Sequence, residues 1–416
     1  MDDRRPVNDC FALPPGVDWT PVADALAALR GSVSPVAAVE ETSLWDAAGR
    51  WLAADAVAVA DHPAATNAAV DGYAFAHTDY LAEPLTVAEG RAAAGAPFGR
   101  ALRSGEAVRI LTGAPLPTGA DTVMLDEDAR LDGGRLYGPT GLRAGVNRRN
   151  AGENIAVGDV VLNAGDRLTP QALAQAASAG LGRLSVRKRL KVAVLSTGDE
   201  IAAPGEPLGP GGVYDANGPM LAGLLRNWGF EPVILSPAAD DAGVVRAALD
   251  EAAAGAQAIL ASGGASAGDE DHMARLLGEE GSRAVWRIAM KPGRPLALGR
   301  WRGVPVFGLP GNPVAAFVCA LIFARPALTV LAGGPWAEAP VEMRPARFTK
   351  RRKPGRDEFL RARSAPDGGV EVFANEGSGL IRGLLWADGL VHLPDGGPDV
   401  DEGDMVRFLP FAGFGA

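Results

Sequence analysis

Between about residue 190 and residue 331, short apolar runs alternate with longer stretches in which apolar residues recur every three or four positions. The short runs are typical of buried strands and the longer stretches of helices. The pattern predicts strands at 191–196, 232–235, 257–262, 284–290, 296–298 and 304–309, and helices at 220–228, 242–254 and 314–331. Strands alternating with helices indicate a mostly parallel α/β sheet that binds its ligand at the carboxyl ends of the strands.

Other parts of the chain have a different pattern. Short β-type runs at 107–112, 122–125 and 135–137, separated by Gly, Pro and Asp, predict a small β-rich unit between about 61 and 150. Alternating runs at 358–362, 370–373, 390–393 and 405–408 predict a compact β-barrel or sandwich at the C-terminal end. Helical spacing predicts helices at 169–179, begun by Thr169 and Pro170, and at 43–54, with Leu44, Ala48, Trp51 and Leu52 on one face.

Composition narrows the class of protein. A chain of 416 residues is long enough for several domains, and its 47% hydrophobic and 22% charged residues are typical of globular proteins. The net charge of −10 argues against nucleic-acid binding by the chain as a whole. Cys10 and Cys319 cannot form a disulfide framework. The charged N-terminal segment lacks an apolar signal region, and the apolar stretch 314–324 is too short to cross a bilayer. We therefore expect a soluble cytoplasmic protein without membrane or nucleic-acid partners.

Four glycine-rich or polar loops follow strands of the predicted α/β sheet, at 197–200, 263–271, 291–295 and 310–313. Such turns bring backbone N–H groups close to an anion, and a helix N-terminus adds a favourable dipole. Lys291 and Arg294 supply cations, and Glu200 and Asp271 supply carboxylates of the kind that Mg²⁺ prefers. One such loop alone would be read as an ordinary turn whose acid caps a helix. Four loops at one sheet edge indicate a phosphate or other oxyanion held with a hard metal ion.

Alternative chemistries fit less well. Residues 264–268 match the G-x-S-x-G element of serine hydrolases, with Ser266 as nucleophile. His272 is too close in sequence to complete a triad, and His392 lies in the predicted C-terminal β unit. The chain contains no P-loop and no dinucleotide fingerprint, and its four scattered histidines argue against zinc. The basic run 350–353 is more simply a solvated turn than a nucleic-acid contact.

Six motifs then occur in one order along the chain: VDGYA at 70–74, LTGAP at 111–115, STGDE at 196–200, the loop 262–271, MKPGRP at 290–295 and LPGNP at 309–313. Together they resemble the molybdopterin molybdenumtransferase family, which includes the bacterial MoeA proteins and the E domain of gephyrin. The resemblance runs from about Asp18 onward. It implies insertion of molybdate into adenylylated molybdopterin, with release of AMP, formation of the molybdenum cofactor and assistance by Mg²⁺.

The resemblance also implies a multidomain α/β plus β fold. Its expected parts are an elongated helical and strand linker domain (18–60 and 151–188), a β-rich insertion domain (61–150), a central doubly wound, mostly parallel α/β domain (189–335) and a C-terminal β-barrel domain (336–416). Family members are homodimers in which the cleft lies between the α/β domain of one subunit and the insertion of the other. The upstream molybdopterin adenylyltransferase is a further expected partner.

By the same resemblance, residues of this chain receive expected roles. Molybdate is a dianion, so its expected ligands are cations and a hydroxyl group: Lys291, Arg294, Arg361 and Ser378. The expected catalytic residues are Asp71, Thr112, Glu200, Asp271 and Lys291, and Thr112 would donate a hydrogen bond to the pterin. Carboxylates beside phosphates need an intervening cation, so Glu200, Asp240 and Asp271 are the expected Mg²⁺ ligands. Further expected substrate-binding residues are Asn154, Asp240, Gly263, Gly264, Ser266 and Arg287.

The chain departs from the family pattern at several positions. Asn154 stands where an aspartate is usual, and Ala68 and Ala315 stand where serines are common. Arg287 and Arg294 replace lysines, which keeps the charge and changes the donor geometry. These departures leave two alternatives open: a non-catalytic molybdopterin-binding scaffold of the same fold, and a variant that inserts tungstate.

Overall fold

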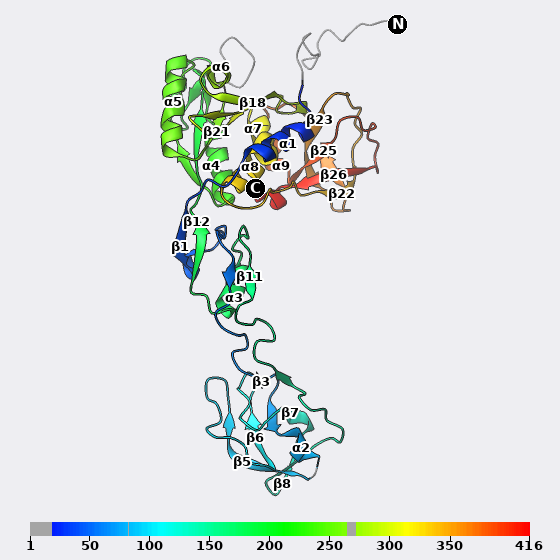
Figure 1. Ribbon diagram of the computed structural model, residues 1–416. Coiled ribbons are helices and arrows are strands. Elements are labelled where there is room, and N and C mark those ends of the chain that lie inside the picture. Colours follow the sequence, from blue (N-terminus) through cyan, green and yellow to red (C-terminus); the bar gives the residue numbers. More distant parts are fainter. Residues whose placement is uncertain (1–18, 82, 264–271) are drawn as a thin grey trace. The chain divides into compact units, whose positions relative to one another are not determined.

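The computed structural model describes residues 19–81, 83–263 and 272–416 (Figure 1). The chain divides into two compact units, one formed by residues 40–186 and the other by the rest of the described chain. Residues 20–38 belong with the second unit, because Thr20 bridges Ile288 and the Val36 N–H donates to the Leu331 carbonyl (2.9 Å). The finer division into four domains stays a prediction.

The second unit contains the α/β sheet that the pattern predicts. Its strands follow the order β16 (Glu231–Ile234), β13 (Lys191–Ser196), β17 (Ala258–Ser262), β21 (Val304–Leu309), β20 (Pro295–Trp301) and β18 (Ser282–Arg287). The first four strands are parallel, and β20 runs antiparallel to both of its neighbours. Their register sets Ser196 beside Ser262 and Ser262 beside Leu309. The loops that follow β13, β17 and β21 therefore leave the same edge of the sheet.

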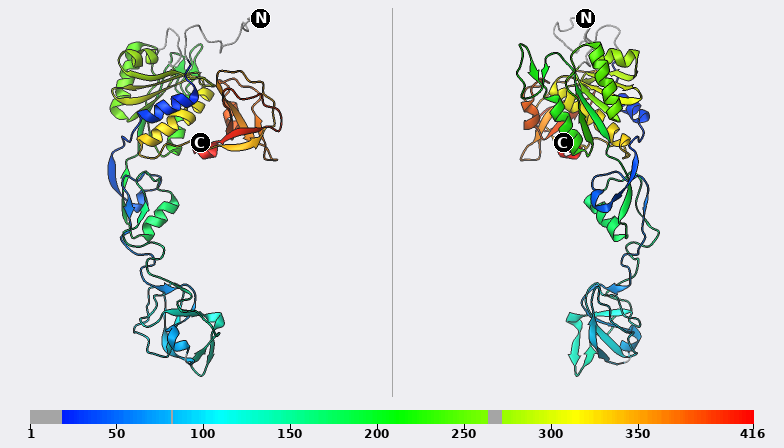
Figure 2. Two further views of the ribbon diagram at one scale, coloured as in Figure 1. Left: turned by 45° about the vertical axis from the view of Figure 1, so that its right-hand side comes forward. Right: turned by 90° about the vertical axis from the view of Figure 1, so that its left-hand side faces the viewer.

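Helices cover both faces of this sheet (Figure 2). One face carries α5 (Ala242–Gly255) and α6 (His272–Glu279), whose Val245, Leu249 and Leu276 pack with Ile259 of the sheet in a buried core. The other face carries α4 (Asn217–Asn227), α7 (Pro313–Cys319) and α8 (Arg325–Leu331), with α1 (Val22–Ser32) beyond them. Burial on both faces explains why the strands read as continuous apolar runs.

The helix after β21 ends at Leu331, as the pattern over 314–331 predicts, and so extends beyond the apolar run 314–324. A π-helical turn, Ala320–Ala324, joins α7 to α8, and the helix continues through Pro326 to Leu331. A wider turn accommodates a proline that would clash with the carbonyl four residues earlier. The 19-residue helix Pro313–Leu331 is apolar and long enough to cross a membrane, but 89% of its most apolar window is buried inside the protein. It is a core helix of the second unit.

The C-terminal part of the second unit contains a sheet with the order β19 (Met290–Lys291), β23 (Asp357–Ser364), β25 (Gly389–Leu393), β26 (Met405–Pro410) and β22 (Glu342–Pro345). β24 (Val370–Val372) pairs with β23, and Ala346, directly after β22, bridges Val370. The pattern predicted a barrel or sandwich here; the structure shows this sheet, with the residue after β22 bridged to β24. Two short helices, α9 (Arg382–Trp386) and α10 (Phe411–Phe414), accompany it.

The first unit is built mainly from strands. Its largest sheet has the order β7 (Thr122–Leu125), β4 (Gly72–Phe75), β6 (Glu106–Ile110), β5 (Leu85–Ala92), β9 (Arg135–Tyr137) and β8 (Arg130–Asp132), with α2 (His77–Tyr80) beside it. Two-stranded pairs complete the unit: β1 (Val39–Ser43) with β12 (Arg183–Arg187), β2 (Ala56–Val57) with β11 (Val160–Leu162), and β3 (Asn67–Ala68) with β10 (Arg148–Arg149). Helix α3 (Pro170–Ser178) begins as predicted, because the Thr169 hydroxyl accepts a hydrogen bond from the Ala172 N–H.

The helix predicted at 43–54 is wrong. Residues Leu44–Asp46 form one 3₁₀ turn capped by Ser43, and Gly49 then adopts a positive φ of 72°. The Leu52 N–H donates to the Asp166 carbonyl (2.9 Å), and the Ala53 N–H donates to the Ser185 carbonyl (2.8 Å). Pairing with distant backbone thus replaces the helical hydrogen bonds, although the apolar spacing of this segment suits a helix.

Candidate functional site

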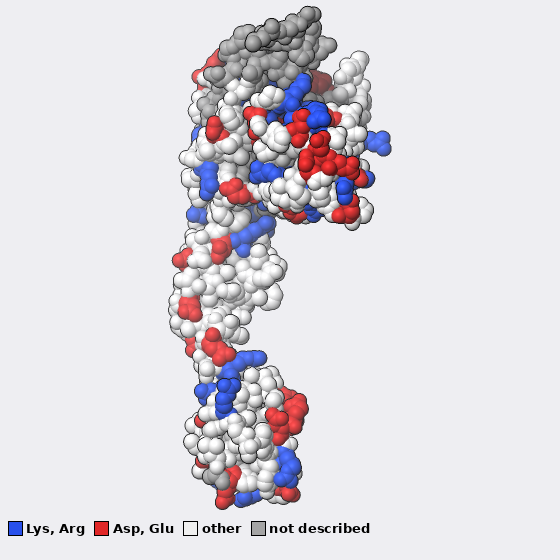
Figure 3. Space-filling model, turned by 90° about the vertical axis from the view of Figure 1, so that its right-hand side faces the viewer, with Lys and Arg blue, Asp and Glu red and all other residues white. Residues whose placement is uncertain are grey.

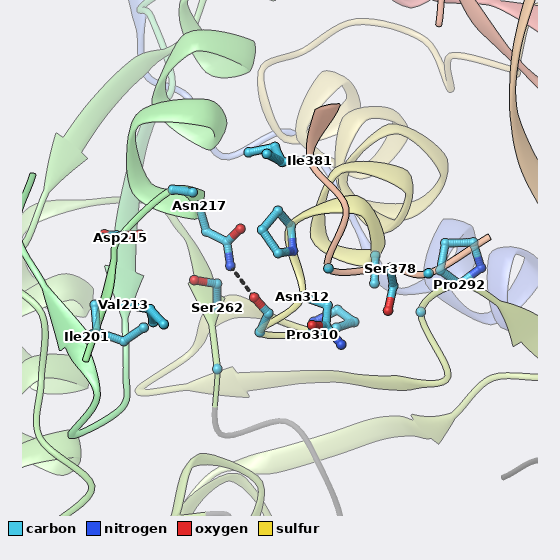
Figure 4. Close-up of a pocket in the computed structure, with 18 of the residues that line it drawn as sticks. Ile201, Val213, Asp215, Asn217, Ser262, Pro292, Pro310, Asn312, Ser378 and Ile381 are labelled. Carbon is cyan, nitrogen blue, oxygen red and sulfur yellow. Dashed lines mark hydrogen bonds between the residues drawn. The ribbon is translucent and has the colours of Figure 1, made fainter. Parts of the chain in front are cut away.

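A cavity of about 1170 Å³ lies at the carboxyl edge of the α/β sheet (Figure 4). The loops after β13, β17 and β21 form one side of it, and the segments 291–294 and 375–379 form the other. Five of the residues expected to bind metal or oxyanion line this one cavity: Glu200, Asp240, Lys291, Arg294 and Ser378. Gly263 also lines it. The structure thus brings loops distant in sequence together at one polar cavity, while the roles expected of these residues stay predictions.

A hydrogen-bonded cluster forms part of the cavity wall. The Ser196 hydroxyl donates to Asp215 Oδ2 (2.8 Å) and lies 3.3 Å from the Ser262 hydroxyl, and Asp215 Oδ1 accepts from the Gly218 N–H (2.8 Å). Asn217 Nδ2 donates to the Gly311 carbonyl (2.7 Å), which ties the start of α4 to the loop before α7 (Figure 4). The wall is therefore fixed before any ligand arrives.

Two buried polar atoms in this wall lack a hydrogen-bond partner within the described residues: Thr197 Oγ1 and Asn217 Oδ1. Both residues line the cavity, and their exposed fractions are 4% and 7%. An unpaired buried polar atom costs about 1–3 kcal/mol, so such atoms usually have a partner. Both unpaired atoms belong to residues in the wall of this cavity.

Gly263 leaves no room for a side chain where β17 enters the cavity. Its φ is +89°, and a Cβ atom built there would lie 2.2 Å from the Thr197 carbonyl oxygen. Glycine adopts this conformation without a steric penalty. The backbone after β17 therefore stays in close contact with the loop after β13.

The acidic side of the cavity carries Glu200 and Asp240. The Asp240 N–H donates to Asp199 Oδ1 (2.9 Å). Burial raises the pKa of Asp240, and the nearby charges of Asp199 and Glu200 raise it further. The negative charges of Asp199 and Glu200 disfavour ionisation of Asp240, and a bound cation would relieve this repulsion. Within the described ranges, however, no group of three or more His, Cys, Asp or Glu side chains has a metal-binding arrangement, and Asp271 lies outside those ranges.

The basic side is organised around Glu376, which the sequence analysis did not identify. Glu376 Oε2 accepts a hydrogen bond from Lys291 Nζ, and its Oε1 accepts one from Lys350 Nζ. Lys350 also lies 3.3 Å from Glu358 Oε2, and Arg356 Nη2 donates to Glu358 Oε1 (3.2 Å). Burial raises the pKa of Glu376, but hydrogen bonds from Lys291 and Lys350 outweigh burial and hold this pKa below its usual value. Glu376 is therefore ionised at neutral pH.

The network also changes the interpretation of the basic run 350–353. Arg351 is exposed and pairs with Asp399 (2.9 Å), as a solvated turn would, and acidic side chains lie among the basic ones on this face (Figure 3). Lys350 and Arg356, by contrast, are largely buried in the ion-pair network. A run of like charges in the sequence gave no indication that its first member points inward.

Arg361, which the resemblance implied as an oxyanion ligand, does not face the cavity. It lies on β23, is 4% exposed and does not line the cavity. Its Nη1 donates to the Leu380 carbonyl (2.7 Å), and its Nη2 donates to the carbonyls of Gly377 (3.1 Å) and Asn375. Its guanidinium group thus holds the backbone of the loop that presents Ser378, rather than facing the cavity itself.

Arg287 and Arg294 contact the same aromatic ring. The Arg294 guanidinium carbon lies 5.4 Å from the Trp19 ring centroid and that of Arg287 lies 5.9 Å from it, both within the range of a cation–π interaction. Arg294 lines the cavity, whereas Arg287 does not. The Thr20 N–H donates to the Arg287 carbonyl (2.9 Å), so the segment that carries Trp19 is fixed to the end of β18.

The remaining expected residues lie in the first unit or outside the described ranges. In the first unit, the backbone N–H and the hydroxyl of Thr112 both donate to Asp71 Oδ1 (2.6 Å each), and the hydroxyl followed by the N–H lowers the pKa of Asp71. The Asn154 N–H donates to the His62 carbonyl (3.1 Å). Gly264, Ser266 and Asp271 are outside the described ranges.

The histidines proposed for a hydrolase are used elsewhere. His392 Nε2 lies 2.6 Å from Asp357 Oδ2, and its ring stacks on Phe359 within the C-terminal sheet. His272 Nδ1 lies 3.1 Å from Arg275 Nη2. Neither histidine lines the cavity.

Comparison with known proteins identifies the family. The family model for the MoeA N-terminal region (domain I and II) matches residues 20–180. The model for a probable molybdopterin binding domain matches residues 193–330, and that for the MoeA C-terminal region (domain IV) matches residues 345–411. This chain belongs to the MoeA family. The cavity of this MoeA-family chain is lined by residues of the second and third matched regions.

Curated relatives and solved structures agree with this assignment. The molybdopterin molybdenumtransferase of Haemophilus influenzae is 34% identical over 89% of this chain and 94% of its own length. Molybdopterin molybdenumtransferase 2 of Mycobacterium tuberculosis is 35% identical over 88% of this chain and 93% of its own length. The crystal structure of a molybdopterin biosynthesis MoeA protein from Pyrococcus horikoshii OT3 superposes with a TM-score of 0.83, at 27% identity over 94% of this chain and all of that one. The family supports a role in molybdenum cofactor biosynthesis.

Proposed function

We propose that this chain is a molybdopterin molybdenumtransferase that inserts molybdate into adenylylated molybdopterin, releases AMP and forms the molybdenum cofactor. The observation that supports this most is that Lys291, Arg294 and Ser378 line the same cavity as Glu200 and Asp240. Cations at one end suit an oxyanion, and carboxylates at the other suit a cation bound to phosphates. The names of the curated relatives agree with this activity.

The oxyanion would bind at the end formed by the segments 291–294 and 375–379. Lys291 would act there as a point charge and Arg294 as a donor of several N–H groups, while the Ser378 hydroxyl would donate to a further oxygen. The Val314 N–H donates to the Ser378 carbonyl (3.2 Å), which holds Ser378 at the start of α7. In this proposal Arg361 acts through the loop that it supports.

Mg²⁺ would bind at the acidic end. Glu200 and Asp240 would hold it, and the raised pKa of Asp240 beside Asp199 and Glu200 supports a cation at this position. When bound, the ion would neutralise phosphate oxygens of the adenylylated substrate. Asp271 stays an expected third ligand. Phosphate oxygens and water would fill the other positions, as is usual for this ion.

The organic part of the substrate would lie between these two ends. Thr197 Oγ1 and Asn217 Oδ1 would form hydrogen bonds with it, because both atoms are buried in the wall and lack a partner among the described residues. A homodimer in the cytoplasm, supplied by an upstream molybdopterin adenylyltransferase, completes the proposal.

The test is a reconstitution with purified full-length protein. Adenylylated molybdopterin, molybdate and Mg²⁺ are mixed with the protein, and AMP is measured by chromatography, with an active homologue as positive control. We expect release of AMP that requires both molybdate and Mg²⁺. If the homologue releases AMP and this chain does not, the proposal fails.

Ala315, which lines the cavity where the family often has serine, motivates a binding scaffold as the alternative. Rescue of molybdoenzyme activity in a bacterial strain that lacks the transferase would exclude that alternative.

A further inference from the structure

The carboxylate of Glu376 binds Lys291, the lysine that is expected to bind the oxyanion. Its carboxylate uses one oxygen for Lys291 and the other for Lys350, and both Lys291 and Glu376 line the cavity. Ser378, the hydroxyl group expected at the same oxyanion, follows two residues later in the same loop. A carboxylate and an oxyanion make the same kind of charge-assisted hydrogen bond to an ammonium group. Both would therefore draw on the positive charge of Lys291.

The two ends of the ion-pair network differ in how easily they exchange partners. At the inner end, Glu358 and Arg356 have side chains only 2% and 9% exposed, so neither can separate without leaving a buried charge. At the outer end, the side chains of Lys291 and Glu376 are 22% and 36% exposed. Exchange of one partner for another is therefore easiest at the pair between Lys291 and Glu376.

The network also allows Glu376 to release Lys291 without becoming unpaired. Lys350 contacts Glu376 Oε1, whereas Lys291 contacts Oε2. Lys350 is itself fixed by Glu358 at 3.3 Å. When an oxyanion takes the place of Oε2 at Lys291, Oε1 can keep its bond to Lys350. The displaced carboxylate thus stays charged and partly paired at the edge of the cavity.

We propose that Glu376 is an affinity-setting residue that competes with the oxyanion substrate for Lys291, so that molybdate binds only by displacing its carboxylate. This inference rests on the proposed function, because it takes the anion at Lys291 to be the oxyanion substrate. In this inference, Glu376 weakens the binding of molybdate. A neutral side chain of the same size at this position therefore strengthens the binding of molybdate.

The test compares molybdate binding by wild-type protein and the Glu376→Gln variant, with sodium molybdate alone as the probe and isothermal titration calorimetry on the full-length protein. Displacing one charge-assisted hydrogen bond corresponds to about a tenfold change in affinity. We expect Glu376→Gln to bind molybdate about tenfold more tightly. Glu371→Gln is the matched control, because Glu371 lies on the same sheet, pairs with Arg363 (2.9 Å) and does not line the cavity. We expect no change in this control.

A second background shows whether the gain acts through Lys291. In a Lys291→Ala protein, adding Glu376→Gln should give no gain, because the competition is for that lysine. A gain that persists without Lys291, or that Glu371→Gln reproduces, would show a general charge effect and overturn the inference. If the wild type binds molybdate and Glu376→Gln binds it equally or more weakly, the inference is overturned and the proposed function stands. If neither the wild type nor Glu376→Gln binds molybdate, the cavity has no oxyanion site, and both proposals are overturned.

Discussion

Replacing Arg361 with methionine should loosen the loop that carries Ser378. Methionine keeps the length and apolar packing of the side chain but donates no hydrogen bond, so the carbonyls of Asn375, Gly377 and Leu380 lose their donor. Hydrogen bonds to charged groups are worth about 1.5–3 kcal/mol each. Nη2 serves the carbonyls of both Asn375 and Gly377, so we count two bonds, one for each nitrogen. Because the released carbonyl groups can bind water, we take the lower bound for two such bonds, a loss of about 3 kcal/mol. The free energy of opening this loop falls by that amount.

Hydrogen–deuterium exchange measured by mass spectrometry on the full-length protein reads this quantity directly. The amides of Gly377 and Gly383 are hydrogen-bonded within the segment, at 2.9 Å to Asn375 Oδ1 and 3.1 Å to the Leu380 carbonyl. A loss of about 3 kcal/mol corresponds to exchange that is about 100-fold faster in peptides covering this segment. Arg363→Met is the control, because Arg363 is exposed and pairs with Glu371, and such a pair contributes at most about 1 kcal/mol.

Two results would refute the reasoning. Unchanged exchange in Arg361→Met would show that the three carbonyls do not depend on the guanidinium group. Loss of molybdate binding with unchanged exchange would show that Arg361 binds the oxyanion directly, which is the role that the sequence resemblance implied.

Three further predictions concern charge. Lys291→Ala should weaken molybdate binding by tenfold or more in calorimetry, because a main counter-charge is lost, and unchanged affinity would remove Lys291 from this role. Thr112→Val should raise the pKa of Asp71, followed by NMR of its carboxyl carbon, because the hydroxyl is the largest cause that lowers it; an unchanged midpoint would contradict the geometry. Hydrogen bonds from Arg100, the larger cause, and from the Arg103 N–H lower the pKa of Glu106 to about 2, so Arg100→Ala should raise it part of the way toward 4.5. Because the folded pKa is depressed, the stability that Glu106 contributes is fully present above pH 4.5 and is lost as the pH falls through 2, so this component of acid unfolding should be smaller in the variant.

Strand positions could be predicted closely where local signals are strong. Apolar runs bounded by Gly, Pro or Asp located β7 (Thr122–Leu125) and β21 (Val304–Leu309) at both ends, and the apolar run 191–196 located β13 (Lys191–Ser196). The segment 43–54 shows the limit of this approach. Its apolar spacing suits a helix, but its backbone pairs with residues more than a hundred positions away in sequence, which local pattern does not show.

In the site, too, local pattern predicted where residues lie but not what their side chains contact. Polar loops after strands of the α/β sheet predicted that Glu200 and Lys291 would share a cavity, and the family resemblance added Asp240; all three line it. The environment of each side chain could not be predicted. Arg361 binds backbone carbonyls and Glu376 pairs with Lys291, and both contacts depend on how β23 and its neighbouring segments fold together. The roles expected for the individual residues stay predictions.

Strand β19 has a consequence for dissecting this protein. Met290 and Lys291 come from the region of the α/β sheet, yet they pair in parallel with Asp357 and Glu358 of β23. A fragment that begins after residue 336 would therefore lack a strand of its own sheet and expose the start of β23. The same two-residue strand fixes the backbone of Lys291, so this cation reaches its position only when both regions have folded. Excised pieces are thus poor substitutes for the intact chain, and a split or permuted version would have to keep residues 290–291 alongside the C-terminal sheet.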